Sequence, residues 1–420
     1  MNLAHFYQTS TVLEFMNEHY LKEGRTPPEH VFSKMEVTAD DHNDGIDMQG
    51  ISWDFVQSDR EKLRSQRFEE YFNYRSLSTT RESILKEISP VISDGNFFKF
   101  NYASLRDTCS ITHFQLRNLL WATSKNDVYY TSHSGIEHWS PICRTSQSVL
   151  DFKEHSCATH FRASSLICRE DIILVGGFNG EILCKNISSG AFHSGVVTKN
   201  PNGITNHLDI SQSRSGALQT IISSNDRCVR IMDLETSQIT NTFEFEWPIN
   251  CTAASPDGRL LSVVGDHTDC SVVNAETGDV IHTLSGHVDY SFATAWSPDS
   301  RVLATGNQDM TARLYDTRYF SKSFAVLETQ MAAVRSLRFS PDGRFLVIAE
   351  PADFIHILDA HSLDRSQVID FFGEIAGVSF PENESDSLYV GVVDDVIFGF
   401  NSCIMEFTTD IMDSLAQLCI

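Results

Sequence analysis

The sequence contains no run of about 18 apolar residues, no two cysteines at C-x-x-C spacing and comparatively few basic residues. Its first residues, MNLAHFYQTS, have no basic segment followed by an apolar one, so neither a membrane span nor a secretion signal is expected. The ten cysteines stand singly, which predicts neither a disulfide framework nor a zinc site. These absences predict an intracellular protein, in the cytoplasm, the nucleus or both, with no metal and no other cofactor.

The scarcity of positive charge has a further consequence. The chain has 56 acidic and 32 basic residues, for a formal net charge of -24. A field of this sign repels phosphate backbones and anionic lipid surfaces. We therefore expect no direct binding to nucleic acid or to membranes. The expected partners are other proteins or peptides, with basic ones favoured.

Proline is also scarce, with 11 residues against 28 phenylalanines and 11 tyrosines, and this ratio favours strands because aromatic side chains pack well on a pleated sheet. Four prolines recur 40 to 43 residues apart, in ASPDGRLLSVVG, WSPDSRVLATG, FSPDGRFLVIA and SFPENESDSLYVG. A second series, an Asp or Asn at the end of a later strand, recurs every 41 to 47 residues, at Asn186, Asp233, Asn274, Asp316, Asp359 and Asn401. The chain is therefore built from repeats.

A period of about 40 to 45 residues with four short strands per unit is typical of the blade of a WD-repeat β-propeller. NLLWATSKNDVYYTSHSG, ahead of the first marked unit, adds one divergent unit and brings the total to seven. We predict an all-β fold, a seven-bladed WD-repeat β-propeller over residues 96–407. A short, partly helical N-terminal extension over 1–95 and a C-terminal tail over 408–420 complete the expected domains.

Two segments flank the repeats and are candidates to close the ring. They are Asn96 to Leu105 on the N-terminal side and Ser402 to Phe407 on the C-terminal side. Completing one blade with a strand from a chain end removes the free edge of the sheet. Either segment is a candidate for the last outer strand.

The unit that contains LATGNQDMTARLYDTR places two acids, a tyrosine and an arginine close together. In WD-repeat proteins the corresponding positions form a buried hydrogen-bond relay, which the resemblance assigns here to His287, Thr305, Asp309 and Tyr315, with Tyr where Trp is usual. Such a relay holds the strands of a blade together, since a buried carboxylate needs donors. We interpret Asp309 as a structural residue and not as a catalytic acid.

No catalytic residue is assigned. VGGFNG, from Val175 to Gly180, imitates a phosphate-binding loop, but it lies at a repeat turn and has no following helix and no lysine. The sequence has neither a G-x-S-x-G nor an H-E-x-x-H motif. We expect that the protein is not an enzyme, and a site assembled from several blades is the remaining enzymatic alternative.

The region before the repeats has helical periodicity. TVLEFMNEHYLKEG carries Leu13, Met16 and Tyr20 at helical spacing. The following TADDHNDGIDMQG is interpreted as a solvated acidic linker, because its acids lack the spacing of an EF-hand loop. Ser58 to Glu61 form a predicted capping box that opens a second helix.

This second helix carries an apolar stripe of Leu63, Phe68, Tyr71 and Phe72 with arginines between them. One interpretation is that the stripe packs on the propeller. The other is that part of the stripe belongs to a helix that binds a partner.

Several segments are more specific than the general repeat. MQGISWDFV, HFQLRNLLWATSKNDVYY, DYSFATAW, GNQDMTARLYD and FGEIAGVSF together resemble a family of WD-repeat proteins found in plants and fungi. The resemblance runs from about residue 48 to near residue 400. It implies a seven-bladed propeller with a short N-terminal extension and no assigned activity.

LATGNQDMTARLYDTR also resembles the sixteen-residue box by which some propellers dock on the adaptor of a cullin ubiquitin ligase. The resemblance makes Asp316 and Arg318 the contacts, with Tyr315 in place of the usual Trp. It therefore implies a cullin ligase adaptor as a partner.

The main functional hypothesis is a non-catalytic scaffold that mediates protein–protein interactions. Its candidate contacts are large side chains where loops lead into the inner strands, namely Trp247, Tyr290, Met331 and Phe372. The alternative is a substrate receptor of a cullin-type ubiquitin ligase, and an enzyme with a site across blades comes third.

Overall fold

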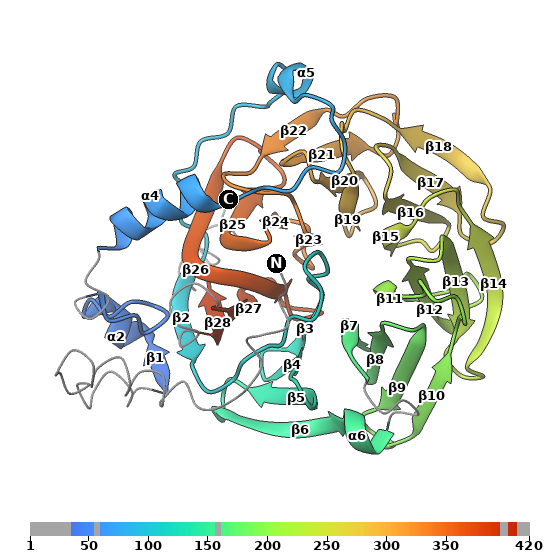
Figure 1. Cartoon of the computed structure of the whole chain (residues 1–420), viewed down its shortest axis with the longest axis horizontal. Coiled ribbons are helices and arrows are strands. Elements are labelled where there is room, and N and C mark those ends of the chain that lie inside the picture. Colours follow the sequence, from blue (N-terminus) through green and yellow to red (C-terminus); the bar gives the residue numbers. More distant parts are fainter. Residues whose placement is uncertain (1–34, 54–58, 156–160, 395–401, 410–420) are drawn as a thin grey trace, which may run out of the picture.

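The computed structural model describes residues 35–53, 59–155, 161–394 and 402–409. Their strands form five four-stranded sheets and one eight-stranded sheet around a common axis (Figure 1). The eight-stranded sheet contains two blades, so the ring has seven. Each inner strand contacts the inner strand of the next blade, and the last contacts the first. The prediction of an all-β, seven-bladed propeller is confirmed.

The five separate sheets are blades one to five. Blade one has β3 (Leu120–Ser124), β4 (Asp127–Thr131), β5 (Gly135–Ser140) and β6 (Thr145–Asp151), followed by the short helix α6 (Phe152–His155). Blade two has β7 (Ala163–Arg169), β8 (Ile172–Gly177), β9 (Glu181–Asn186) and β10 (Phe192–Val196). Blade three has β11 (Thr205–Gln212), β12 (Leu218–Ser224), β13 (Cys228–Asp233) and β14 (Gln238–Glu244). Blade four has β15 (Ile249–Ala254), β16 (Leu260–Gly265), β17 (Cys270–Asn274) and β18 (Val280–Leu284), and blade five has β19 (Ser291–Trp296), β20 (Val302–Asn307), β21 (Thr311–Asp316) and β22 (Ala325–Glu328).

The last two blades share one long strand. Blade six has β23 (Ser336–Phe339), β24 (Phe345–Ala349), β25 (Ala352–Asp359) and the first part of β26 (Ser366–Ser379). The second part of β26 is the inner strand of blade seven and pairs with β27 (Ser387–Val393). The change of partner falls at Glu374, which pairs with both β25 and β27.

Both ends of the chain complete blade seven. β28 (Cys403–Thr408) is its third strand and pairs with β27, and β2 (Lys99–Ser104) pairs with the other edge of β28. Of the two candidate segments, the N-terminal one is the fourth strand, and β1 (Glu36–Thr38) adds a fifth. Asn401, expected at the end of a third strand, lies outside the described residues, and β28 supplies that strand instead.

The Ser-Pro-Asp turns share one local geometry. The Ser255 hydroxyl donates to Asp257 (2.6 Å) and accepts from the amide of Leu260 (3.0 Å), and the turns at Ser297 and Ser340 repeat both bonds. Each turn has one residue with positive φ. This residue is glycine in two turns, Gly258 (68°) and Gly343 (74°), and serine in the third, Ser300 (61°). We call the side of the disc that carries these turns the proline face. The opposite side, where connections enter the inner strands, is the loop face.

Side chains of the inner strands tie neighbouring blades together. The Ser164 hydroxyl donates to the carbonyl of Thr205 (2.7 Å). The Asn206 amide donates to the carbonyl of Ile249 (2.7 Å), and the Asn250 amide donates to that of Ser291 (3.0 Å). These bonds supplement the apolar packing between blades, where most strand side chains are buried on both faces.

The N-terminal segment wraps around blades five to seven. After β1 come α2 (Ala39–Asn43), α4 (Arg60–Glu70) and α5 (Glu82–Leu85). Figure 1 shows α4 over blade six, the chain crossing from it to α5 at the outer rim, and a return along the rim to β2. On the way back Ser89 bonds to Val326 of β22, and Ile92 and Gly95 bond to residues 364–366 beside and within β26.

Two local expectations for this segment are corrected. The supposed linker is ordered: Thr38 and Asp41 form a capping box around α2, and Gln49 exchanges two hydrogen bonds of 2.6 Å with the backbone of Phe372. The cap of α4 is Asp59, whose carboxylate accepts from the amide of Lys62 (2.6 Å). Ser58, and the helix expected around Leu13, Met16 and Tyr20, lie outside the described residues.

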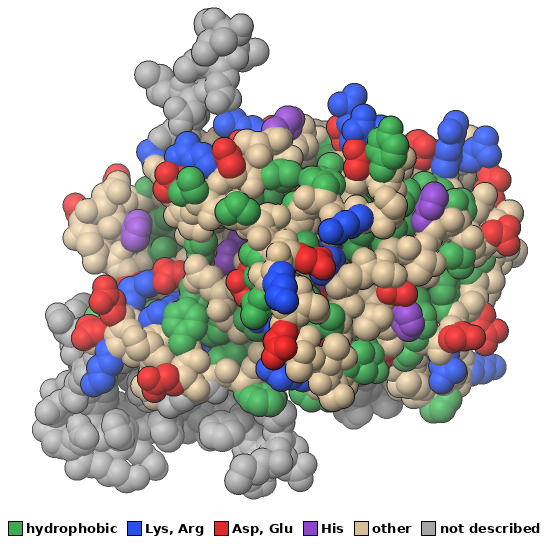
Figure 2. Space-filling view, turned by 90° about the horizontal axis from the view of Figure 1, so that it is seen from above, with side chains coloured by type: hydrophobic (Ala, Val, Ile, Leu, Met, Phe, Trp, Pro, Cys, Tyr) green, Lys and Arg blue, Asp and Glu red, His purple; other side chains and the backbone are tan. Residues whose placement is uncertain are grey.

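The side of the rim drawn in Figure 2 mixes all kinds of side chain. Figure 2, which views the disc from its edge, shows acidic, basic and hydrophobic side chains interspersed. In the part of the chain that the structure describes, no helix is long and apolar enough to cross a bilayer.

Candidate functional site on the loop face

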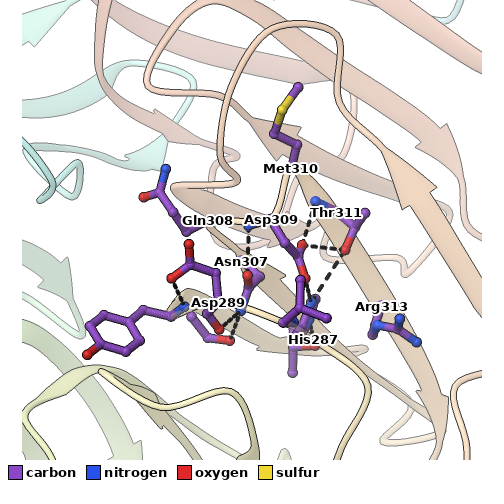
Figure 3. Close-up of polar contacts among 12 residues, drawn as sticks. His287, Asp289, Asn307, Gln308, Asp309, Met310, Thr311 and Arg313 are labelled. Atoms are coloured by element: carbon purple, nitrogen blue, oxygen red, sulfur yellow. Dashed lines mark hydrogen bonds and ion pairs between the residues drawn. The ribbon is translucent and has the colours of Figure 1, made fainter. Parts of the chain in front are cut away.

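Asp309 lies at the centre of a buried polar cluster in blade five (Figure 3). Its carboxylate accepts from His287 Nδ1 (2.9 Å), from the Thr311 hydroxyl (2.6 Å) and amide (3.0 Å), and from the amide of Val288 (3.1 Å). Burial works to raise the pKa of the Asp309 carboxyl, but His287 and the donated hydrogen bonds outweigh burial and hold that pKa below its ordinary value. The cluster therefore stabilises a charged Asp309 inside the protein.

The relay continues from His287 to Thr305 and Tyr315. His287 Nε2 lies 2.9 Å from the Thr305 hydroxyl, and the Tyr315 hydroxyl lies close to that of Thr305. The Tyr315 hydroxyl lies 3.3 Å from the carbonyl of Ser285. The order is thus Asp309, His287, Thr305, Tyr315, with histidine between the acid and the strand hydroxyl. All four side chains are buried, which suits them to hold strands together.

Next to this relay, blade five contacts the N-terminal segment. Asp289 accepts from the amide of Ser76 (3.0 Å). The Gln308 side chain donates to Asn73 Oδ1 (2.8 Å) and to the carbonyl of Tyr74 (2.6 Å), and its oxygen accepts from Arg335 (2.7 Å). Figure 3 shows Asp289, Asn307 and Gln308 grouped on one side of Asp309. The loop face of blade five thus binds residues 73–76 by direct polar contacts.

Arg64 is the central anchor of α4. Its guanidinium donates to Asp353 (2.8 Å) and to the carbonyl of Phe371 (2.6 Å). It also lies 4.1 Å from the ring centroid of Phe372 and 4.6 Å from that of Phe354. Because the Asp353 carboxylate is fully buried, this ion pair is shielded from water, and removing either partner would leave a buried charge.

Two further arginines, one on each side of Arg64, complete the attachment. Arg60 makes a bidentate contact with the carboxylate of Asp370, with hydrogen bonds of 2.6 and 2.9 Å. Arg67 Nε donates to Asp353 (2.9 Å). Planar guanidinium groups suit such paired contacts with carboxylates. The sequence showed the arginines but not their partners, which lie 286 to 310 residues further along the chain.

The apolar stripe of α4 packs only in part. Tyr71 joins the cluster of Met331, Ala352 and Phe354, Leu63 contacts the cluster around Phe372, and the Phe68 ring stacks on that of Phe354 (5.5 Å). Phe72 is 81% exposed. Of the two interpretations left open, packing on the propeller describes α4, while Phe72 remains available at the surface.

Two of the predicted partner contacts are covered by the chain itself. Phe372 is fully buried under Trp53, Leu63 and Arg64, and Met331 is 7% exposed beside Tyr71. Met331 precedes the inner strand β23, as expected, whereas Phe372 lies within the long strand β26 and not at a loop. The sequence gave no sign that the N-terminal segment covers either residue. They are not surface contacts in this structure.

The other predicted contacts lie in more open positions. Trp247 is partly exposed and stacks on His267 (5.7 Å), and Tyr290 is partly exposed beside Asp289. A depression of about 390 Å³ lies between Phe72, Asn73 and Arg75 on one side and Asp289 and Met310 on the other. The open part of the loop face therefore extends from blade four to the edge of the N-terminal segment.

Asp316 and Arg318 lie on the proline face, after the third strand of blade five. The Arg318 guanidinium donates to both carboxylate oxygens of Asp316 (2.6 and 2.9 Å), and its side chain is 68% exposed. Hydrogen bonding with Arg318 lowers the pKa of Asp316 to about 2. This pair is accessible and lies outside the buried relay.

The described residues contain no group of three or more His, Cys, Asp or Glu side chains placed to hold a metal ion. Their cysteines are free, and five of them are buried among strands. VGGFNG forms the end of β8 and the turn into β9, where Gly180 has a φ of 75°, as a hairpin turn requires.

Comparison with known proteins agrees with this architecture. Residues 278–316 match the model of the WD domain, G-beta repeat, and residues 332–370 match an uncharacterised protein domain, DUF2415. An uncharacterised protein of Schizosaccharomyces pombe is 27% identical over 267 residues, which are 60% of this chain and 74% of that protein. A chain in the crystal structure of the mitotic checkpoint complex superimposes with a TM-score of 0.59 at 15% identity, covering 71% of this chain and 92% of that one.

Other relatives are similar over shorter stretches. WD repeat-containing protein SL1-17 of Schistosoma mansoni is 32% identical over 142 residues, 33% of this chain and 45% of that protein. WD repeat-containing protein 1 of Bos taurus is 25% identical over 183 residues, 38% of this chain and 29% of that protein. The matches thus span less than half of either relative. The repeat, the closed ring of blades and these similarities together show that the chain has the fold of a WD-repeat β-propeller.

Proposed function

We propose that this protein is a non-catalytic scaffold that binds other proteins through its loop face. The observation that carries the proposal is the way this face holds residues 60–76, with the buried carboxylate of Asp353 and the half-buried one of Asp370 bound to arginines and with aromatic rings beneath them. A rigid surface that binds one peptide segment by such contacts is suited to bind another. The net charge of -24 favours basic partners.

The open part of the loop face supplies the contacts for a partner. Trp247 and Tyr290 offer aromatic anchors, and Phe72 borders the depression between blade five and the N-terminal segment. Asp289, which is buried beside Tyr290 and bound to Ser76, lines this depression and adds negative charge to it. Together they fit a peptide with apolar and basic side chains.

Affinity purification followed by quantitative mass spectrometry tests this proposal. The full chain is compared with the double variant Trp247→Ala/Tyr290→Ala, and Ile142→Ala, an exposed residue of the turn after β5, is the control. We expect the double variant to lose specific partners by about tenfold or more, as loss of interface anchors does, and the control to retain them. Unchanged partners in the double variant would contradict the loop-face assignment, and substrate turnover by the isolated protein would favour the enzymatic alternative.

The alternative function, a substrate receptor of a cullin-type ubiquitin ligase, is favoured by one feature. Arg318 is exposed and Asp316 half-buried on the proline face, where docking would leave the loop face free for a substrate. Arg318→Ala is therefore expected to abolish co-purification of the ligase adaptor without changing the melting temperature. Arg214→Ala removes a comparable exposed ion pair with Glu276 and serves as the control. If the wild-type protein never retains the adaptor, this alternative is wrong.

A further inference from the structure

The proline face opens into a cavity at the axis of the ring. Its volume is about 630 Å³, within the usual range for small-molecule sites of about 300 to 1,000 Å³. The prolines of four repeat turns, Pro256, Pro298, Pro341 and Pro381, surround it, and inner-strand side chains form its walls. This cavity lies on the side of the disc opposite α4, and neither proposed function uses it.

Arg338, on the inner strand of blade six, lines the cavity. One of its terminal nitrogens donates to Asn118 Oδ1 (3.0 Å), and its guanidinium lies 4.8 Å from the ring centroid of Trp121. Its Nε is buried and has no hydrogen-bond partner among the described residues. A buried guanidinium with an unused donor is costly unless an acceptor reaches it.

Two more nitrogens in the same cavity have the same property. Trp121 Nε1 and His207 Nδ1 are buried without a hydrogen-bond partner in the described part of the chain. His207 is only 5% exposed, and burial together with nearby Arg338 lowers its pKa to about 3, so the imidazole is uncharged at neutral pH. An uncharged imidazole with its proton on Nδ1 donates from that nitrogen. The wall can thus present three donors, one of them charged.

The wall of the cavity also carries acidic groups, which oppose the binding of an anion. Asp209 accepts from the amide of Ala254 (3.0 Å), and burial raises the pKa of its carboxyl. Burial likewise raises the pKa of Glu382, which lines the cavity together with Glu170. Asp209 lies within electrostatic reach of Arg338 and competes with any other anion for it.

We infer that this cavity binds a small organic anion, whose carboxylate or phosphate oxygens accept hydrogen bonds from Arg338, Trp121 and His207. Oxygen anions match the unused donors of Arg338 and Trp121, and that of His207 when its proton is on Nδ1, and charge-assisted hydrogen bonds to arginine are the strongest of their kind. The cavity is large enough for such a molecule and is open at the proline face. The inference is independent of the scaffold function, which concerns the other side of the disc.

Isothermal titration calorimetry on the full chain tests the inference with two probes, inorganic phosphate and citrate, in buffers matched in ionic strength with sodium chloride. If only one of the two probes gives heat of binding, that probe identifies the class of anion, phosphate or carboxylate. We expect saturable binding of at least one, weakened about tenfold or more by Arg338→Gln, since one charge-assisted hydrogen bond is lost. Asp209→Asn is expected to strengthen binding, because it removes a competing negative charge.

Matched variants separate the cavity from general charge effects. Arg259→Gln removes an exposed arginine from a turn of the proline face and should leave binding unchanged. Trp121→Phe removes the indole N–H while keeping a ring beside Arg338, so it supplies an answer if Arg338→Gln does not fold. Binding that survives both Arg338→Gln and Trp121→Phe, or no binding of either probe beyond the chloride control, would overturn the inference.

Discussion

At the scale of single residues, Asp309 combines deep burial with a favoured negative charge. Four donors within 3.1 Å hold it, among them His287 and Thr311. A side chain used for proton transfer would be expected to have its pKa moved toward neutrality, whereas the pKa of Asp309 is moved away from it. This direction fits a structural role for the relay.

Asp309→Ala should lower the free energy of unfolding by about 2 to 4 kcal/mol, because the buried donors of His287 and Thr311 lose their acceptor. Chemical denaturation monitored by circular dichroism measures the change. Glu235→Ala, in an exposed turn, is the control and should change stability by less than about 0.5 kcal/mol. An unchanged unfolding free energy for Asp309→Ala would contradict the structural role.

The same carboxylate should make stability depend on pH. Because the folded-state pKa of Asp309 is lower than its ordinary value of 3.8, the contribution is complete above that value and is lost as pH falls through the folded pKa. The difference in unfolding free energy between the wild-type protein and Asp309→Asn should therefore be constant near neutrality and shrink below about pH 4. A difference that grows in acid would contradict this sign.

Ser300 occupies a turn position that its two counterparts fill with glycine. Its φ is 61°, close to the 68° of Gly258 and the 74° of Gly343. A side chain in this conformation costs about 1 kcal/mol relative to glycine. Ser300→Gly should therefore raise the unfolding free energy by about 0.5 to 1 kcal/mol, and Gly343→Ala should lower it by a similar amount. A destabilised Ser300→Gly would show that the serine has another role.

At the scale of elements, α4 is attached mainly by polar contacts. Arg60, Arg64 and Arg67 reach Asp353 and Asp370, while Phe68 and Phe72 stay substantially exposed. An element held in this way can detach without unfolding the sheets, since few large apolar side chains join the two.

Arg64→Ala should release α4 while the blades stay folded. Loss of one partner of a buried ion pair costs about 3 to 5 kcal/mol, so amide exchange in residues 60–70 should become at least about a hundredfold faster. Hydrogen–deuterium exchange with mass spectrometry measures this, and Lys62→Ala, exposed on the same helix, is the control. If the blades lose protection together with α4, the helix belongs to the same cooperative unit.

The sequence predicted the blades well and the attachment of α4 poorly. Turns and strands follow local patterns, so the Ser-Pro-Asp series located the inner strands of blades four to six directly. The meeting of Arg64 with Asp353 joins residues far apart in the chain, and no periodic pattern records it. The burial of Phe372 escaped prediction for the same reason, because its cover is Gln49 and Trp53 from the N-terminal segment.

At the scale of the whole molecule, stability depends on the closure of blade seven. β28 pairs with β27 and with β2, so it joins the two ends of the chain in one sheet. Its side chains Cys403, Ile404 and Met405 are fully buried. Without β28, both neighbouring strands would have open edges.

A chain that ends at residue 401 should therefore fail to give a monomeric, cooperatively unfolding protein, because two apolar strand edges are exposed. Size-exclusion chromatography and thermal unfolding measure the outcome, and a chain that ends at Thr409, which retains β28, is the control. We expect the control to behave as the full chain does. A monomeric protein with an unchanged transition in the absence of β28 would contradict this view of closure.

The pairing of β2 with β28 also decides how the ring responds to mechanical load. Lys99 lies opposite Thr408 and Ser104 opposite Ile404, so the chain enters β2 and leaves β28 at the same end of the pair. Tension applied between residues 96 and 409 would therefore peel the two strands apart one bridge after another, instead of shearing all bridges at once. A ring closed in this way therefore opens at low force when its two ends are pulled, because the hydrogen bonds between β2 and β28 break in sequence.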